Sequence, residues 1–353
     1  MSVCANRVLV LFASILLTAC DPFASPEGLF KEYVERTARV LEGEAGLSPV
    51  PTVDQLPRRR ERTVDIPPLD VSMLDFFGLY GCELQHVVGE RNSIMGRVMH
   101  PATLLDYEVR FLRAAEDCLS VIDSERLVAR IGEIIELKRG SIVDAAWNTV
   151  WATSEIEAFL TRSRGPLEVQ PDRDMIGTMA ADLRTMSDML QRVGDGSTEA
   201  DVKRLDDVYQ RWHARPLAGQ LLRAAVLATT RLDDASRLIE ARVEGRPVCA
   251  RPDLRPRAAE NMRGMFMSVY IGEVQPYLAE IQRARRELMP PLRELAAIGG
   301  GRSAALAGYA RRTLGEADAD SVWHRFDRAV ARHAEAWQAL LGQCGMRPGQ
   351  ESG

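Results

Sequence analysis

The sequence predicts an all-α protein, a multi-helix, bundle-like assembly stapled by disulfide bonds. Apolar residues recur at helical spacing along most of the 353 residues, and no convincing run alternates as a strand would. Four of the six cysteines follow residue 20, an even number that suits two bridges. With 46% hydrophobic and 27% charged residues, the chain can bury a sizeable core in one large or two modest domains.

Residues 1–19 have the composition of a secretory signal peptide. One cation, Arg7, precedes an apolar run over residues 8–17, and small residues follow. The run is too short for a membrane-spanning helix, which needs roughly 20 apolar residues. Asp21 and Pro22 then interrupt it. We therefore expect the segment to be removed, against the alternative of a permanent membrane helix.

The four residues Leu17-Thr18-Ala19-Cys20 resemble the lipobox of bacterial lipoproteins. The resemblance implies cleavage before Cys20, a diacylglycerol on its thiol and a further acyl chain, such as palmitate, on its amine. Two or three chains anchor stably, because each buried CH₂ contributes about 0.8 kcal/mol. Asp21 resembles an inner-membrane retention signal, which implies the periplasmic side of the inner membrane rather than the outer one. An ordinary signal peptide with a cysteine near the cut is the alternative.

The charge and motifs of the chain argue against several partners. The net charge is −5, whereas nucleic-acid binding requires clustered Lys and Arg, so we expect no nucleic acid. Broad adhesion to anionic lipid is disfavoured for the same reason. The glycine-rich stretch at 298–303 lacks the Gly-Lys-Ser/Thr ending of a phosphate loop, so we expect no nucleotide. The covalent lipid on Cys20 is the only cofactor-like group expected.

The cysteines that remain after Cys20 are expected to form two disulfides in an oxidising compartment. They are Cys82, Cys118, Cys249 and Cys344. Residue 100 lies midway between the first two, and Pro101 follows it, so antiparallel helices at about 83–97 and 103–118 would place those two cysteines opposite each other. We favour Cys82–Cys118, which leaves Cys249–Cys344, among three pairings. The spacing of Cys and His suggests no metal site.

The helical domain is predicted to span residues 25–345. Residues 20–24 form the tether, and 346–353 form a disordered tail. Ser25 and Pro26 start the first helix, which ends near Gly43. Further helices are expected at about 124–139, 141–163, 175–193, 198–213, 216–244, 257–288, 291–298, 302–313 and 318–342. The Gly-Pro stretch near 165 is a candidate boundary between halves 25–165 and 172–345.

Residues 47–68 contain five prolines and an arginine-rich run at 58–62, and this density of proline predicts that no helix forms there. The run favours a solvated loop whose cations pair with nearby acids. The alternative is contact with lipid headgroups near the anchor, at about 1 kcal/mol per cation.

The predicted hairpin also carries a family resemblance. The residues are Glu90-Arg91-Asn92-Ser93, Gly96-Arg97-Val98-Met99, Pro101 and Tyr107-Glu108. Together with the lipobox, they resemble an uncharacterised family of Gram-negative envelope lipoproteins, domain of unknown function family 3080. The resemblance implies a lipoprotein over most of the mature chain and brings no activity.

The hairpin also contains the candidate polar site. Positions equally distant from residue 100 face each other, which brings together Glu90, Arg91, Asn92, Asp106, Glu108 and Arg110. Such a cluster suits a polar ligand or a catalytic carboxylate with a shifted pKa. The alternative, which we favour, is an ion-pair network that fixes the register of the two helices.

Three functional hypotheses follow. The first is a non-catalytic interaction or scaffold factor that presents helix faces to another envelope protein. The second is a binding module for a lipid, glycan or peptide, in which Trp147 and Trp151 would line a groove instead of packing in the core. The third is a cell-wall hydrolase that uses Glu90 and Glu108 as paired carboxylates. We identify no catalytic residue and consider an enzyme the less favoured interpretation.

Overall fold

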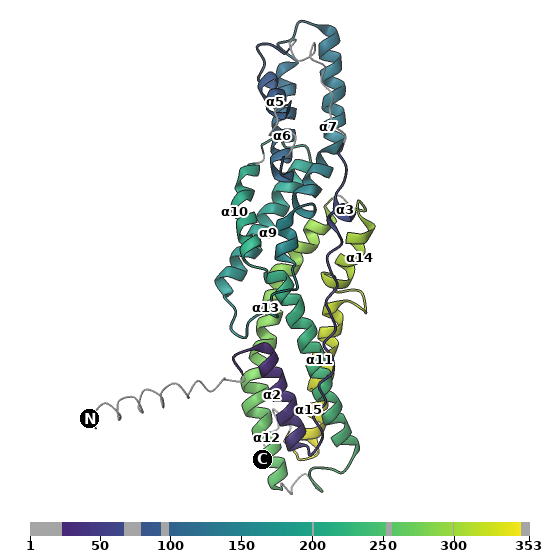
Figure 1. Cartoon of the computed structure of the whole chain (residues 1–353). Helices are drawn as coiled ribbons and strands as arrows, with labels where there is room; N and C mark the ends of the chain where they lie inside the picture. Colours follow the sequence, from purple (N-terminus) through teal and green to yellow (C-terminus); the bar gives the residue numbers. More distant parts are fainter. Residues whose placement is uncertain are drawn as a thin grey trace, which may run out of the picture.

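The computed structural model describes residues 23–66, 79–92, 99–199, 201–251, 256–298 and 300–346. The predicted signal peptide, Cys20, Asp21 and the tail from residue 347 on lie outside these ranges. Within them the chain is built from helices and irregular segments, with no strand. Figure 1 shows an elongated molecule whose helices run mostly along its length. The all-α prediction is confirmed.

One end of the molecule is a bundle in which α2 (Pro26–Val40) lies against α11 (Leu217–Glu244) and α12 (Arg257–Met265), while α11 also packs on α15 (Val322–Gly342). The predicted start of α2 is confirmed. The Ser25 hydroxyl accepts a hydrogen bond from the Gly28 N–H at 3.1 Å, and Pro26 occupies the first turn.

The chain from α12 to α13 (Gln275–Ala297) forms one continuous helix, interrupted only by a π-helical segment, η3 (Phe266–Val274). The expected break between 288 and 291 is wrong, since Pro290 and Pro291 lie inside α13. An interior proline costs about 3 kcal/mol. Burial of Met289, Leu292 and Leu295, at roughly 1.5–3 kcal/mol each, offsets that cost and keeps the helix intact.

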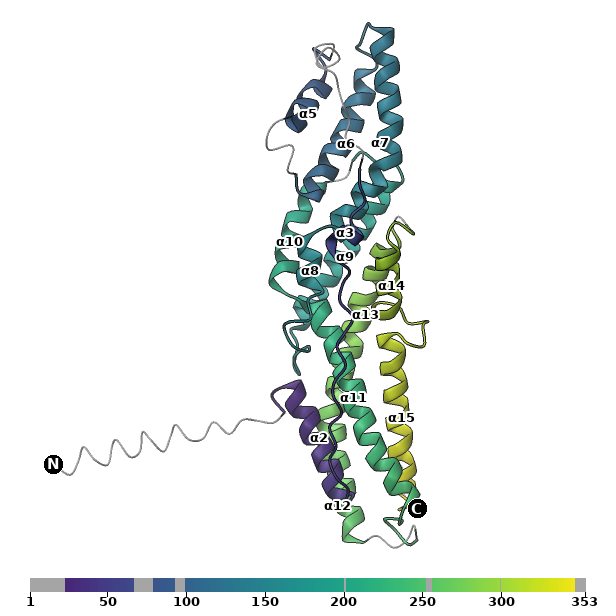
Figure 2. The same cartoon turned by 45° about the vertical axis from the view of Figure 1, so that its right-hand side comes forward.

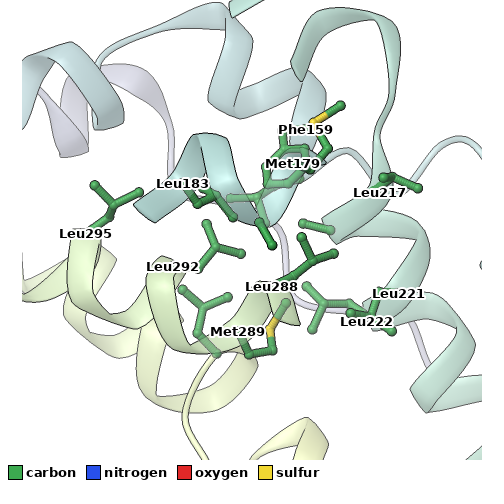
Figure 3. Packing of buried hydrophobic residues seen from close by; sticks show 14 of the residues in the cluster. Phe159, Met179, Leu183, Leu217, Leu221, Leu222, Leu288, Met289, Leu292 and Leu295 are labelled. Atoms are coloured by element: carbon green, nitrogen blue, oxygen red, sulfur yellow. The ribbon is translucent and has the colours of Figure 1, made fainter. Parts of the chain in front are cut away.

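The middle of the molecule is the crossing of α9 (Arg173–Gly194), α11 and α13. It also contains α8 (Ser154–Phe159), η2 (Val202–Arg204) and α10 (Leu205–Ala214). Figure 3 shows the side chains that fill this crossing: Phe159, Met179, Leu183, Leu217, Leu221, Leu222, Leu288, Met289, Leu292 and Leu295. Buried residues on both sides of the predicted boundary near 165 belong to one hydrophobic cluster.

The opposite end is an arm made of α5 (Glu83–Asn92), α6 (Pro101–Cys118) and α7 (Glu125–Trp151), seen at the top of Figure 2. The predicted turn is confirmed, because His100 caps α6 and Pro101 opens it. The break expected between 139 and 141 is wrong. A glycine inside a helix costs only about 1 kcal/mol, and α7 buries residues on either side of Gly140.

Both favoured disulfides are present. Cys82 is bonded to Cys118 with their Cα atoms 5.6 Å apart, at the end of the arm. Cys249 is bonded to Cys344 with a Cα separation of 5.3 Å, which ties the chain beyond α11 to the end of α15. Each bridge therefore closes one end of the elongated molecule.

The proline-rich residues 47–58, which we name the strap, run along α11 toward α14 (Ala304–Thr313) as an irregular segment (Figures 1 and 2). A single turn of helix, α3 (Arg59–Arg62), follows directly. The prediction that proline excludes any helix here is wrong. Pro57 lies outside the turn, and the Glu61 carboxylate accepts the Arg58 N–H at 2.8 Å, which caps it.

Among the helices in the described ranges, none combines the length and the apolar character needed to cross a bilayer.

Candidate functional site

The predicted polar site on the arm forms in part. Two guanidinium nitrogens of Arg110 donate to Glu90 at 3.3 and 2.5 Å, and its Nε donates to Asp106 at 3.0 Å. The hydrogen bonds from Arg110 lower the pKa of Glu90. Half of the Glu90 side chain is exposed (52%), and exposed pairs contribute only about 0–1 kcal/mol. The cluster therefore acts as a surface ion pair between α5 and α6.

The expectation that Glu108 joins this cluster is wrong. Residues 106 and 110 share one face of α6, whereas residue 108 points to another face and is buried. Its carboxylate pairs with Lys138 of α7, whose ammonium lies 4.6 Å from the centre of the Phe111 ring. Burial lowers the pKa of Lys138, and Glu108 opposes that shift.

Arg91 and Asn92 are the other two residues of the predicted site. Arg91 is half-buried, and its charge contributes to the lowered pKa of the buried Lys138, after burial itself. The Asn92 side chain lies outside the described part of the chain. Glu90 and Glu108 thus face different surroundings, each beside its own cation, and they do not form the paired carboxylates of a hydrolase.

A groove of about 900 Å³ lies beside the strap, and sequence reasoning did not find it. It is bounded by the strap, α3, the chain that follows α8, and α11. Its apolar lining is provided by Val50, Val53, Leu56, Leu160, Pro166, Val226 and Leu227. This volume is in the range of small-molecule sites in proteins, about 300–1,000 Å³.

Close backbone packing builds one wall of this groove. A Cβ placed on Gly219 would lie 1.9 Å from the Thr161 carbonyl oxygen, so only glycine lets α11 approach the chain after α8 so closely. The Leu167 N–H donates to the Gln220 carbonyl oxygen at 3.0 Å and holds the same two segments together. The wall formed by Leu160 and Thr161 is therefore rigidly attached to α11.

The groove is rich in arginine. Five arginines and three carboxylates line it, an excess of two positive charges on a chain whose net charge is −5. Two of the arginines share one carboxylate: Arg59 donates to Glu157 at 3.1 and 3.0 Å, and Arg62 also donates to it. Arg62 is fully buried and also donates to two backbone carbonyls, one of them Pro57 O at 2.7 Å.

The remaining three arginines of the groove, Arg58, Arg162 and Arg223, make no ion pair within the ranges that the structure describes. Arg162 donates to Val53 O at 2.7 Å and to the Gln55 side chain at 3.2 Å. Arg223 donates to Arg162 O at 2.6 Å. Since a guanidinium carries five N–H donors, Arg162 and Arg223 retain donors that an anion can accept.

A second polar cluster lies deep in the bundle and was also missed from the sequence. His333 Nε2 lies 2.5 Å from the Tyr33 hydroxyl, and its Nδ1 lies 2.9 Å from the Ser236 hydroxyl. The Trp337 indole N–H donates to Tyr33 at 2.8 Å. Burial lowers the pKa of His333 to about 3, so the imidazole is neutral. These four residues, the histidine cluster, join α2, α11 and α15.

The histidine cluster is enclosed within the bundle. Ser236 and His333 resemble a nucleophile with its base, but both are fully buried, and neither lines the groove beside the strap. The i, i+4 spacing of His333 and Trp337 on the apolar face of α15 was the only signal in the sequence.

The other candidate features have structural roles. Trp147 and Trp151 are buried, and their indole N–H groups donate to Arg62 O at 2.6 Å and Leu295 O at 3.1 Å. They pack in the core, which corrects the alternative that they line a groove. Among the described residues, no group of three or more His, Cys, Asp or Glu side chains is placed to hold a metal.

Comparison with known protein families gives a match over most of the chain. No curated protein and no solved structure matches this chain. The model of a family described as "Protein of unknown function (DUF3080)" matches residues 30–348, which include α2 from Phe30 on, the arm, the strap and the closing helix α15. The chain therefore belongs to this family of proteins of unknown function.

Proposed function

We propose that this protein is a lipoprotein anchored through Cys20 at the periplasmic side of the cell envelope, at the inner rather than the outer membrane. Its body is a non-catalytic interaction factor that presents the arm to another envelope protein. The lipobox and Asp21 support the anchor. Only two residues separate Cys20 from Phe23, where the described chain begins, so the anchor lies within about 11 Å of that residue.

The single observation that carries the interaction role is the set of exposed apolar side chains on the arm. Tyr80, Val121 and Leu137 are 87%, 62% and 63% exposed, and they are half of the large hydrophobic residues that are exposed in the described ranges. Tyr80 and Val121 lie two and three residues from the disulfide between Cys82 and Cys118. Tyr80 and Val121 therefore expose apolar surface at the end of the arm, and Leu137 exposes it further along α7. Exposed apolar patches mark interaction sites, and tyrosine is enriched at interfaces.

The position of the arm supports the same role. In both views the arm occupies the end of the molecule far from α2, whose start follows the proposed anchor (Figures 1 and 2). The disulfide removes conformational freedom from the presented end, which lowers the entropic cost of binding. An anchored body of this shape holds a rigid contact surface away from its point of attachment.

A second candidate function, the binding of a small envelope ligand, is supported by the arginine-lined groove. The hydrolase hypothesis loses its motive, because Glu90 and Glu108 pair with different cations on different faces of the arm.

The anchor is tested by mass analysis and membrane fractionation of a Cys20→Ser protein. The variant should lose the acyl mass and leave the membrane fraction. Cys4→Ser, inside the predicted signal peptide, is the matched control and should keep both. Retention of the acyl mass in the Cys20→Ser protein would refute the lipoprotein assignment.

The interaction role is tested by site-specific photo-cross-linking in intact envelopes. A photoreactive side chain at Tyr80 or Leu137 should capture the same envelope protein, and Val121→Glu, next to the same disulfide, should abolish capture from position 80. Met267, 50% exposed on η3, is the control position and should not capture it. Equal capture from position 267, or none from the arm, would contradict the proposal.

A further inference from the structure

We propose that the groove beside the strap binds an anionic phospholipid, with the phosphate at Arg162 and Arg223 and the acyl chains along the apolar wall. This deepens the second candidate function and rests on the proposed anchoring only for the supply of lipid. The groove, its charge and its position each contribute to the inference.

The charge of the groove selects an anion. Arg162 and Arg223 are half-buried, lack a carboxylate partner in the described part of the chain, and are linked through the Arg162 carbonyl oxygen. Partly desolvated guanidinium groups bind phosphate through paired N–H donors, more strongly than exposed ones do. Arg58, exposed on the same lining, adds a third cation without an ion pair.

The apolar wall selects an amphiphile over a free anion. Val50 is 38% exposed and Leu56 is half-buried on the strap side of the groove, and the edges of Val53, Leu160, Val226 and Leu227 complete its apolar lining. The groove therefore offers hydrocarbon beside the guanidinium groups. An acyl chain gains about 0.8 kcal/mol for each CH₂ that it buries there, which inorganic phosphate cannot gain. The combined chemistry is that of a phosphate attached to acyl chains.

The other side of the strap provides an internal comparison. A groove of about 540 Å³ shares the strap residues 51–54, but its lining carries three arginines and three aspartates. Those charges cancel. Two of the arginines also have ion-pair partners, since Arg312 pairs with Asp54 of the strap and Arg237 pairs with Asp234 of α11. An anionic ligand therefore favours the larger groove.

The position of the groove suits a ligand taken from the membrane. Glu27, in the first turn of α2, lines it and lies seven residues after Cys20, so the proposed anchor holds this lining within about 25 Å of the lipidated residue. Headgroups of the anchoring membrane are therefore within reach of the groove.

The test uses the full-length chain carrying Cys20→Ser, so that covalent lipid takes no part. Calorimetric titration compares dihexanoyl phosphatidylglycerol with dihexanoyl phosphatidylcholine, which has the same chains and a zwitterionic headgroup, and with inorganic phosphate. The anionic lipid should bind at least about tenfold more tightly than either comparator, the effect expected for charge-assisted hydrogen bonds. Equal affinity for the two lipids, or for phosphate alone, would overturn the proposal.

Arginine variants test the placement of the headgroup. Arg223→Gln should weaken binding of the anionic lipid about tenfold. Arg164→Gln is the matched control, because Arg164 is exposed in the same region but does not line the groove. Equal weakening by both would mean diffuse attraction and would contradict the site.

Folding and anchoring are separated from binding in the same experiment. Arg58→Gln removes an exposed side chain, so it should leave the unfolding temperature unchanged while weakening binding in the same direction as Arg223→Gln. Because the protein lacks Cys20, failure of lipid binding rejects the groove proposal without touching the anchor. If mass analysis shows that Cys20 carries no lipid, the measured binding of lipid in the groove is unaffected.

Discussion

The histidine cluster makes the stability of the protein depend on pH in a defined direction. His333 has a pKa of about 3 in the folded protein because it is buried, against about 6.5 in the unfolded chain. Between these pH values the imidazole is protonated in the unfolded chain and neutral in the folded protein. The contribution of the neutral His333 to the free energy of unfolding is therefore fully present above pH 7 and decreases as the pH falls. Replacement by glutamine removes the titration while retaining hydrogen-bonding groups.

The size of the effect follows from the two pKa values. At pH 5 the preferential protonation of the unfolded chain costs the fold about 2 kcal/mol, and the limit below pH 3 is about 5 kcal/mol. The ionisable groups that face the imidazole ring do not change their charge over this pH range. Burial raises the pKa values of Tyr33 and Tyr270, which stay neutral, and Arg332 stays charged throughout.

Urea unfolding at pH 8 and pH 5 provides the assay. His333→Gln should be less stable than the wild type at pH 8 by about 1–2 kcal/mol, since its hydrogen bonds are imperfect. The stability lost between pH 8 and pH 5 should be about 2 kcal/mol smaller in the variant, because carboxylates elsewhere titrate equally in both proteins. His324→Gln, on the same helix but outside the cluster, is the control. Equal pH dependence in wild type and His333→Gln would refute the reasoning.

Three further predictions concern stability, each measured by urea unfolding. Gly219→Ala should cost at least about 1–3 kcal/mol, because its Cβ would overlap the Thr161 carbonyl; an unchanged midpoint would contradict the close contact. Lys138→Met should cost about 3–5 kcal/mol, because it leaves Glu108 buried without its partner, and adding Glu108→Leu should recover most of this loss. No recovery in the double variant would contradict this prediction. Replacing both Cys249 and Cys344 by serine should cost about 4–5 kcal/mol, because their bridge spans 95 residues; a loss under 1 kcal/mol would contradict this.

Features specified by neighbouring residues were predictable from the sequence. Ser25 and Pro26 define the start of α2 by a side-chain cap and a preset backbone angle. The hairpin of the arm follows from Pro101, directly after the midpoint between Cys82 and Cys118, and the disulfide between these cysteines confirms it.

Features decided by tertiary burial were not predictable in the same way. The helix breaks expected near Gly140 and Pro290 are absent, because buried residues on both sides hold α7 and α13 together against a local cost of about 1 and 3 kcal/mol. The same holds for the partner of Glu108. The spacing on α6 gives the face on which it lies, but only the packing of α7 supplies Lys138.

The groove escapes sequence reasoning because residues far from it in the chain hold the strap in place. Arg231 donates to Ser48 O at 2.8 Å, Arg162 donates to Val53 O at 2.7 Å, and Arg312 pairs with Asp54. Each of these partners is more than 100 residues away from the strap residue that it holds. No local pattern therefore marks the strap as part of a site.

The fold gives the arginines of the arm and those of the groove different chemistry. The Arg110 guanidinium is already neutralised by Glu90 and Asp106. The fold places Arg162 and Arg223 beside hydrocarbon, and neither forms an ion pair within the described ranges. A ligand anion gains most where the protein has supplied no counter-charge of its own. The groove is for this reason a stronger candidate for binding an anion than the Arg110 cluster of the arm, although the arm carries the residues of the family resemblance.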